Sequence, residues 1–307
     1  MTNPEASAAI DSILSGLMER YECRVPNVRK IVDKMVSDGL IANSQEIEND
    51  HIAFRTMGVP HLGIASLEKI FLHHGYEKRD AYRFDKKKLD AYWYSPPQES
   101  LPRIFISELK VGELSDTAQR IIKSYTDEVL SDPVDLLDLD DSEQVVKFLH
   151  QPLWRTPTWQ DYQQLADESE YASWVIYNRY YLNHFTISVH NLQTPFNDLA
   201  AFNKFLVGHG FILNDAGGVI KSSRDGLLRQ SSTVAEMVDA EFAGADGPEI
   251  QSISGSYVEF AERSVLPGFQ SLPATQIKRE HRREGFEAAN ADKIFESTYS
   301  DQTSKNE

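Results

Sequence analysis

A ten-residue segment that occurs twice is the feature of this chain that most constrains its fold. Residues 67–76, LEKIFLHHGY, align without a gap against residues 202–211, FNKFLVGHGF. Lysine, histidine and glycine recur at equivalent positions, and an aromatic residue follows the glycine in both copies. The pattern predicts a helix that ends at a glycine in each copy. Because many helices end at a glycine, two such segments can also match by chance. If the match is genuine, the chain contains one structural module twice.

The stretches around the two segments extend the similarity. A strand-like stretch with a histidine comes before each repeated glycine, and His51 and His184 precede it by 24 and 26 residues. A later strand-like stretch carries a glutamate in each copy, Glu108 in the first and Glu259 in the second. The first copy reads as a strand, a helix and three further strands. The sequence therefore predicts an α+β fold with two βαβββ modules.

Changes in residue pattern divide the chain into five segments. Apolar residues at helical spacing begin near Pro4 and again near Pro26, which indicates a helical N-terminal segment. A second helical stretch separates the two modules. The expected segments are a helical N-terminal segment (1–45), the first βαβββ module (46–115), a helical insertion (116–175), the second βαβββ module (176–270) and a C-terminal helix and tail (271–307).

The composition excludes several classes of function. Lys and Arg number 31 against 47 Asp and Glu, and the net charge of −16 disfavours nucleic-acid binding. Apolar runs are too short to span a membrane, and Cys23, the single cysteine, is expected to be a spectator. The first residues lack the pattern of a secretory signal, so we expect a cytoplasmic location. Neither a dinucleotide-binding glycine motif nor a P-loop is present.

Alternation along three predicted strands places one metal-ligating residue of each on a polar face. His184 shares its face with Thr186, while Phe185 and its apolar partners point the other way. His51 and Glu259 occupy equivalent positions on their own strands. Two histidines and a carboxylate form the ligand set of non-haem Fe(II) oxygenases. Taken singly, each residue also fits a structural role, because strand histidines are often hydrogen-bonded and a glutamate is often exposed.

The combination resembles the vicinal oxygen chelate superfamily, in which βαβββ modules pair and form a cupped sheet. Within it, the segments DHIAFRT, LNHFTISV, GSYVEFAER and HRREGFEAANADKIFEST are similar to the 2-oxoadipate dioxygenase/decarboxylase family, and the similarity runs from about Ile47 to Thr298. The resemblance implies that His51, His184 and Glu259 hold the metal and that Arg55 binds substrate as a catalytic residue.

The same resemblance implies Fe(II) as the cofactor, with a 2-oxo acid and O2 as small-molecule partners. The implied reaction converts a 2-oxo dicarboxylic acid such as 2-oxoadipate to a 2-hydroxy acid such as 2-hydroxyglutarate, with release of CO2. The exact 2-oxo acid, the native metal and the oligomeric state are not determined by the sequence.

Glu108 has two interpretations. Module symmetry offers it as a fourth metal ligand, as in the glyoxalase-like branch of the superfamily. Three protein ligands leave three positions of an octahedral metal, enough for a bidentate 2-oxo acid and O2, whereas four leave only two. We therefore expect Glu108 to lie beside the ligands and orient one of the histidines.

Two other functions remain open. A four-ligand metal-dependent isomerase, lyase or hydrolase of the same superfamily would need Glu108 on the metal and no oxygen. A non-catalytic cup that binds a small molecule would need no metal. Metal content separates the cup from both enzymes, and oxygen consumption separates the two enzymes.

The remaining histidines and the basic residues near the C-terminus are expected to be structural. His73, His74 and His209 are predicted at helix ends, where a cation suits the free carbonyls. His190 is predicted on the strand of His184, roughly 20 Å beyond it and too far to share a metal. Residues 278–283, which contain Lys278, Arg279, Arg282 and Arg283, are predicted as a solvated helix face, with a second contact to an anionic substrate as the alternative.

Overall fold

The computed structural model describes residues 4–306, with side chains described from residue 8 onward. The chain divides into two compact units that each draw on separate stretches of sequence. The first unit holds the chain up to Arg24, Ala53–Asn183 and Met237–Gly255, and the second holds Val25–Ile52, His184–Glu236 and the chain from Ser256. Strand β1 (Asn49–Met57) passes from the second unit into the first after Ile52. Each unit contains most of one predicted module.

The first unit follows the predicted strand–helix–strand order. After β1 come α3 (Ile64–His73), β2 (Glu77–Phe84), β3 (Leu89–Ser95) and β4 (Arg103–Leu109). The strand order is β2-β3-β4-β1, with β3 antiparallel to both β2 and β4. Leu89, Ala91 and Trp93 alternate with less buried residues along β3, as expected for a strand with one face in the core. This arrangement is a βαβββ module.

The second unit repeats the order with one interruption. Its elements are β5 (His184–Ser188), α8 (Leu199–Gly208), β6 (Lys221–Ser222), β7 (Leu228–Ser232) and β10 (Tyr257–Arg263). The strand order is β1-β5-β10-β7-β6, in which β5 and β10 are parallel. A hairpin of β8 (Met237–Phe242) and β9 (Glu249–Ser254) precedes the last strand and belongs to the first unit. The α+β prediction with two βαβββ modules is confirmed.

The two copies of the repeated segment end in the same backbone motif. Gly75 and Gly210 have φ of 84° and 85°, a conformation that favours glycine. The N–H of Tyr76 donates to the carbonyl of Phe71 at 3.1 Å, and the N–H of Phe211 donates to Leu206 at 3.1 Å. Both are the longer hydrogen bond of a Schellman motif, which satisfies a carbonyl that the helix leaves free. The duplication thus extends from residue type to hydrogen bonding.

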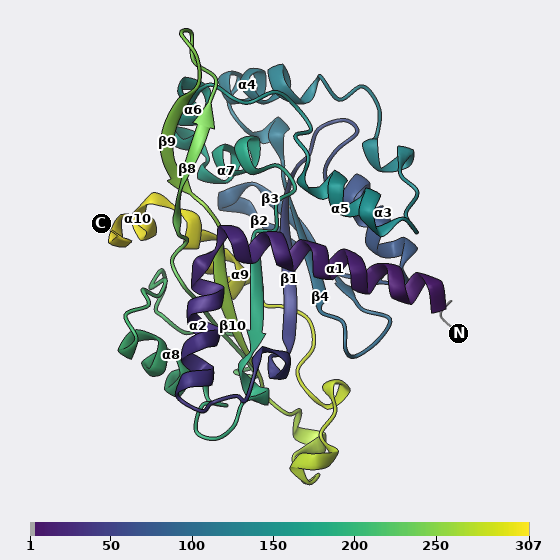
Figure 1. Cartoon of the computed structure of the whole chain (residues 1–307), viewed down its shortest axis with the longest axis vertical. Helices are drawn as coiled ribbons and strands as arrows, with labels where there is room; N and C mark the ends of the chain where they lie inside the picture. Colours follow the sequence, from purple (N-terminus) through teal and green to yellow (C-terminus); the bar gives the residue numbers. More distant parts are fainter. Residues whose placement is uncertain (1–3, 307) are drawn as a thin grey trace. The chain divides into compact units, whose positions relative to one another are not determined.

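Helices occupy the N-terminal segment and the insertion. They are α1 (Pro4–Arg24), α2 (Pro26–Ser37), α4 (Asp116–Thr126), α5 (Ser142–His150), α6 (Trp159–Glu168) and α7 (Glu170–Asn178). In the first unit the β8–β9 hairpin lies beside α6 and α7, where Phe242 packs on Trp159 and Tyr177 with ring centroids 5.1 and 5.0 Å away (Figure 1). Over the described residues, every helix is too short or too polar to cross a membrane.

Two local predictions are wrong. Strand β5 ends at Ser188 and a 3₁₀ turn (Val189–Asn191) follows, so His190 is not on the strand. Residues 278–283 form no helix beyond a 3₁₀ turn (Arg279–His281), because their backbone pairs instead with the chain after β10. The N–H of Leu266 donates to His281, and the N–H of Arg283 donates to Ser264. The later helices are α9 (Ala288–Ile294) and α10 (Ser300–Thr303).

Candidate metal centre

Parallel strands β5 and β10 bring His184 and Glu259 together. In their register His184 pairs with Tyr257 and Thr186 pairs with Glu259. Since side chains two residues apart on a strand share a face, the histidine and the glutamate project to the same side. His184 Nε2 lies 3.0 Å from Glu259 Oε2.

His51 completes the group from β1. Its Nε2 lies 3.3 Å from His184 Nε2 and 3.5 Å from Glu259 Oε1. The three ligand atoms lie within 4.8 Å of one another, and the residues are 1%, 6% and 1% exposed for His51, His184 and Glu259. The structure therefore brings together the three residues that the sequence singled out as ligands.

The donor set and its spacing fit one divalent ion. Two donors at roughly 2.1 Å from an ion lie about 3.0 Å apart at a right angle and about 3.4 Å apart at a tetrahedral angle. The separations of 3.0 Å between His184 Nε2 and Glu259 Oε2 and of 3.3 Å between the two Nε2 atoms fall in this range. Two imidazole nitrogens and one carboxylate oxygen are the ligands of 2-His-1-carboxylate sites, which keep positions open for substrate.

Charge in this buried site is balanced between the carboxylate and the histidines. Burial alone would lower the pKa of His51, but Glu259 and Asp50 outweigh it and raise this pKa. Burial alone would raise the pKa of Glu259, but His51 and His184 outweigh it and lower this pKa. The glutamate is therefore ionised at neutral pH, as a metal ligand must be.

A buried amide fixes the direction of the Glu259 carboxylate. Gln230 Nε2 donates to Glu259 Oε1 at 2.7 Å, and Asn290 Nδ2 donates to Gln230 Oε1 at 3.0 Å. Because Asn290 supplies a donor, the amide oxygen of Gln230 must face it and the amide nitrogen must face Glu259. Sequence reasoning missed Gln230 and Asn290, since nothing in the residue pattern links them to Glu259.

Arg55 lies in the first unit, on the stretch of β1 that begins at Ala53. It is 1% exposed, and its guanidinium lies 5.2 Å from the ring centre of Tyr171 and 5.1 Å from that of Trp174. Aromatic faces on a guanidinium restrict its rotamers and leave its edge for hydrogen bonds. Its contact with a substrate stays a prediction.

Glu108 has a backbone partner that the residue pattern did not predict. Its Oε2 accepts the N–H of Ile64 at 2.9 Å, at the first turn of α3. Gly58 and Gly63 leave room for it, because a Cβ on either residue would lie within 3 Å of a carboxylate oxygen of Glu108. Within the described part of the chain, Glu108 belongs to no group of possible metal ligands. The carboxylate caps a helix, a role that depends on backbone geometry and has no signature in the spacing of histidines and glutamates.

The three histidines predicted at helix ends lie there, and two of them contact carboxylates. His73 Nε2 lies 2.9 Å from Asp140 Oδ1, and His209 Nε2 lies 2.9 Å from Asp38 Oδ2. His73 and Asp140, with His74, form a second group of possible ligands, but the side chains of His73 and Asp140 are 39% and 65% exposed. Cys23 is exposed.

Comparison with known proteins agrees with this geometry. A family model described as 2-oxoadipate dioxygenase/decarboxylase matches residues 13–272. A protein of Arabidopsis thaliana named "2-oxoadipate dioxygenase/decarboxylase, chloroplastic" is 42% identical over 311 residues, which cover 98% of this chain and 80% of the relative. Because that name places the relative in the chloroplast, the cytoplasmic location predicted for this chain is not confirmed.

Two solved structures also match most of this chain. The crystal structure of a hydroxyglutarate synthase from Oryza sativa, in complex with 2-oxoadipate, matches with a TM-score of 0.88 and 42% identity over 98% of this chain and 96% of that one. A glyoxalase-superfamily protein from Ralstonia eutropha matches with a TM-score of 0.73 over 94% of this chain and 90% of that one. At 20% identity, the second likeness concerns the fold alone.

Proposed function

This chain belongs to the 2-oxoadipate dioxygenase/decarboxylase family, and we propose that it converts 2-oxoadipate and O2 to 2-hydroxyglutarate and CO2 with Fe(II) as its metal. The observation that carries the proposal is the buried group of His51, His184 and Glu259 in a chain that is 42% identical to a named family member over 98% of its length. The rice relative crystallised with 2-oxoadipate supports the choice of substrate.

The proposed reaction balances without a further redox partner. The bond between C1 and C2 of 2-oxoadipate breaks, C1 leaves as CO2, C2 becomes a carboxylate and C3 gains a hydroxyl group. Decarboxylation supplies two electrons and hydroxylation supplies two more, which together reduce O2. This balance agrees with a sequence that has neither a dinucleotide-binding motif nor a P-loop.

His51, His184 and Glu259 would hold the ion. When bound, Fe(II) supplies a Lewis acid for the carboxylate and keto oxygens of the 2-oxo acid and a redox-active site for O2. Burial of all three side chains excludes bulk water from this point of the molecule. The amide of Gln230 occupies Glu259 Oε1 and leaves Oε2 for the metal.

Arg55 is the residue proposed to bind a substrate carboxylate. A guanidinium pairs with a carboxylate through two parallel charge-assisted hydrogen bonds, which fix orientation as well as charge. The aromatic rings of Tyr171 and Trp174 restrict the movement of this side chain. Arg55 would then bind the second carboxylate of a dicarboxylate substrate.

The four-ligand alternative has lost its support, because Glu108 caps α3. The non-catalytic cup is not favoured, since the relatives that match 98% of this chain are named as enzymes.

Reconstitution tests the proposed function. Metal-free protein is loaded anaerobically with Fe(II) or with Zn(II), and oxygen uptake is followed with 2-oxo dicarboxylic acids of five, six and seven carbons. We expect uptake with the Fe(II) protein alone, fastest with the six-carbon 2-oxoadipate. A matched control is 2-oxohexanoate, which has the same length without the second carboxylate and should turn over slowly. Absence of oxygen uptake with every 2-oxo acid would reject the proposal.

A further inference from the structure

His51 has a hydrogen-bond partner on the nitrogen that faces away from the other ligands. Its Nδ1 lies 2.8 Å from Asp50 Oδ1, while its Nε2 faces His184 and Glu259. A histidine binds a metal through Nε2 only when the proton is on Nδ1. The hydrogen bond to Asp50 therefore decides which nitrogen of His51 is free.

Asp50 pairs with a buried arginine. Arg263 Nε donates to Asp50 Oδ2 at 2.6 Å and Arg263 Nη2 donates to Asp50 Oδ1 at 2.9 Å, with both side chains at most 1% exposed. A guanidinium offers only N–H donors, so both oxygens of Asp50 accept from Arg263. With its oxygens in use as acceptors, Asp50 takes the hydrogen bond at Oδ1 from His51 Nδ1 as the donor.

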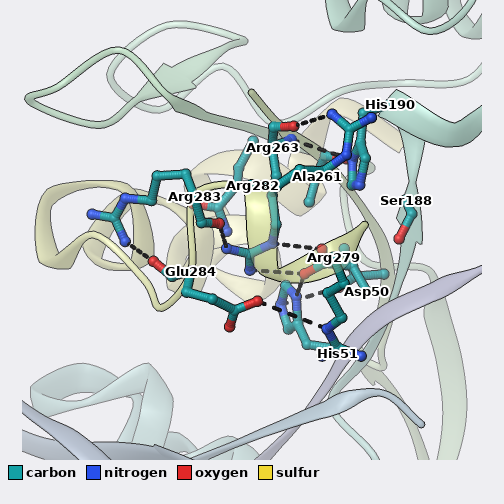
Figure 2. A network of polar contacts seen from close by, with 12 residues as sticks. Asp50, His51, Ser188, His190, Ala261, Arg263, Arg279, Arg282, Arg283 and Glu284 are labelled. Atoms are coloured by element: carbon teal, nitrogen blue, oxygen red, sulfur yellow. Dashed lines mark hydrogen bonds and ion pairs between the residues drawn. The ribbon is translucent and has the colours of Figure 1, made fainter. Parts of the chain in front are cut away.

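Arg263 is itself anchored to the chain that follows β10. Its Nη1 donates to the carbonyls of Arg283 and Gly285 at 3.0 and 2.8 Å (Figure 2). The ring of Phe286 lies 4.8 Å from that of His51 and 5.4 Å from the Arg263 guanidinium carbon. The segment 283–286 thus contacts both Arg263 and His51.

We propose that Asp50 and Arg263 are positioning residues, which hold His51 as the Nδ1-protonated tautomer so that Nε2 is available to the metal. The inference rests on the proposed function in one respect, that His51 is a ligand. A buried ion pair is by itself weak evidence for stabilisation. The proposal gives this ion pair a different role, which is to position His51.

Substitutions of Asp50 and Arg263 test the positioning role. Asp50→Asn keeps the shape of the side chain, but it replaces one acceptor oxygen with an NH2 group, which cannot accept from Arg263 as the second carboxylate oxygen does. Arg263→Lys keeps the charge and loses the fork. Loss of such an outer partner typically weakens metal affinity or activity by roughly 10–100-fold. We expect both variants to bind Co(II) at least tenfold more weakly than the unchanged protein.

A spectroscopic measurement separates positioning from a general structural role. Proton spectra of the Co(II)-loaded protein in H2O should contain a strongly shifted imidazole N–H resonance from His51 that exchanges slowly with D2O, because this proton is buried and hydrogen-bonded to Asp50. In Asp50→Asn and Arg263→Lys the resonance should move and exchange faster. Glu262→Gln is the matched control, because Glu262 neighbours Arg263 on β10 but bonds to Arg229 and to the N–H of Leu199. It should leave the resonance and the Co(II) affinity unchanged.

Each outcome bears on one claim. Unaltered Co(II) affinity and N–H resonance in both Asp50→Asn and Arg263→Lys would overturn the positioning role and leave His51 as a ligand. Absence of a slowly exchanging shifted N–H in the unchanged Co(II) protein would overturn it even if the variants fail to fold. Full Co(II) binding by His51→Ala would instead overturn the ligand assignment on which the inference rests.

Discussion

His184 and Glu259 lie on neighbouring parallel strands and approach to 3.0 Å between Nε2 and Oε2. Their separation is set by backbone pairing within a sheet and by burial, so the two groups have little freedom to move apart. Sites built on strands hold their geometry better than sites built on loops. The three-residue group therefore has a fixed geometry in which a metal ion could bind.

Alanine at His51, His184 or Glu259 should each abolish metal retention. Every substitution removes one of three donors, and the two remaining ligands cannot hold an ion through purification. Metal analysis of protein purified without oxygen checks the result, and circular dichroism serves as the control for folding. Full metal occupancy in Glu259→Ala would show that the carboxylate is not a ligand.

Arg55→Lys should lower kcat/KM for 2-oxoadipate by roughly 10–100-fold, since a hydrogen bond to a charged group contributes about 1.5–3 kcal/mol. Metal content should stay the same. Turnover of 2-oxohexanoate, which lacks the second carboxylate, should change little. Equal losses with both substrates would assign Arg55 to the support of the site rather than to the second carboxylate.

Glu108→Ala should leave metal content and oxygen uptake near those of the unchanged protein. It removes the acceptor for the N–H of Ile64 at the start of α3, and loss of a helix cap costs about 0.5–2 kcal/mol. Urea unfolding measures this loss of stability. Loss of metal with unchanged stability would reverse the assignment and revive the four-ligand enzyme.

His190 should make the protein less stable in acid. Burial lowers the pKa of His190 from 6.5 to about 3. The folded protein then binds fewer protons at this site than the unfolded chain between these pH values, so stability is full above pH 6.5 and falls as pH decreases toward 3. At pH 4 this site should lower the free energy of unfolding by about 3 kcal/mol relative to neutral pH.

Comparison with His190→Asn isolates this effect. Unfolding of metal-free protein is measured from pH 7 to pH 4 for both chains, so that metal release does not contribute. The variant should lose less stability over this range. Parallel curves for the two proteins would show that His190 does not titrate on unfolding.

The candidate ligands could be found from the sequence because their positions follow a strict local rule. Alternation on a strand placed His51, His184 and Glu259 on polar faces, and the repeat indicated that the faces were equivalent. The same rule hid Asp50, since adjacent residues on a strand are assigned to opposite faces. Arg263 lies four residues beyond Glu259, and the alternation assigns both to the same face. The pattern could therefore have indicated Arg263, but not its partner Asp50, which lies far away in the chain.

Other features depend on contacts that residue patterns do not contain. Residues 278–283 contain neither glycine nor proline, so the sequence predicts a helix there. Backbone hydrogen bonds with Ser264 and Leu266 instead hold these residues in an irregular conformation. Glu108 occupies the module position equivalent to Glu259, but glycines at 58 and 63 open a space in which it reaches the start of α3. The division of the chain into five segments stays a prediction, because each compact unit combines stretches that are distant in the sequence.

The reaction itself is tested most directly by turnover of 2-oxoadipate under ¹⁸O2 by the Fe(II)-loaded protein, with O2, CO2 and the product measured together. We expect one CO2 to be released for each O2 consumed and the 2-hydroxyglutarate formed to carry ¹⁸O. Conversion of 2-oxoadipate that continues unchanged under strict anaerobiosis, or product without label, would contradict the proposed reaction.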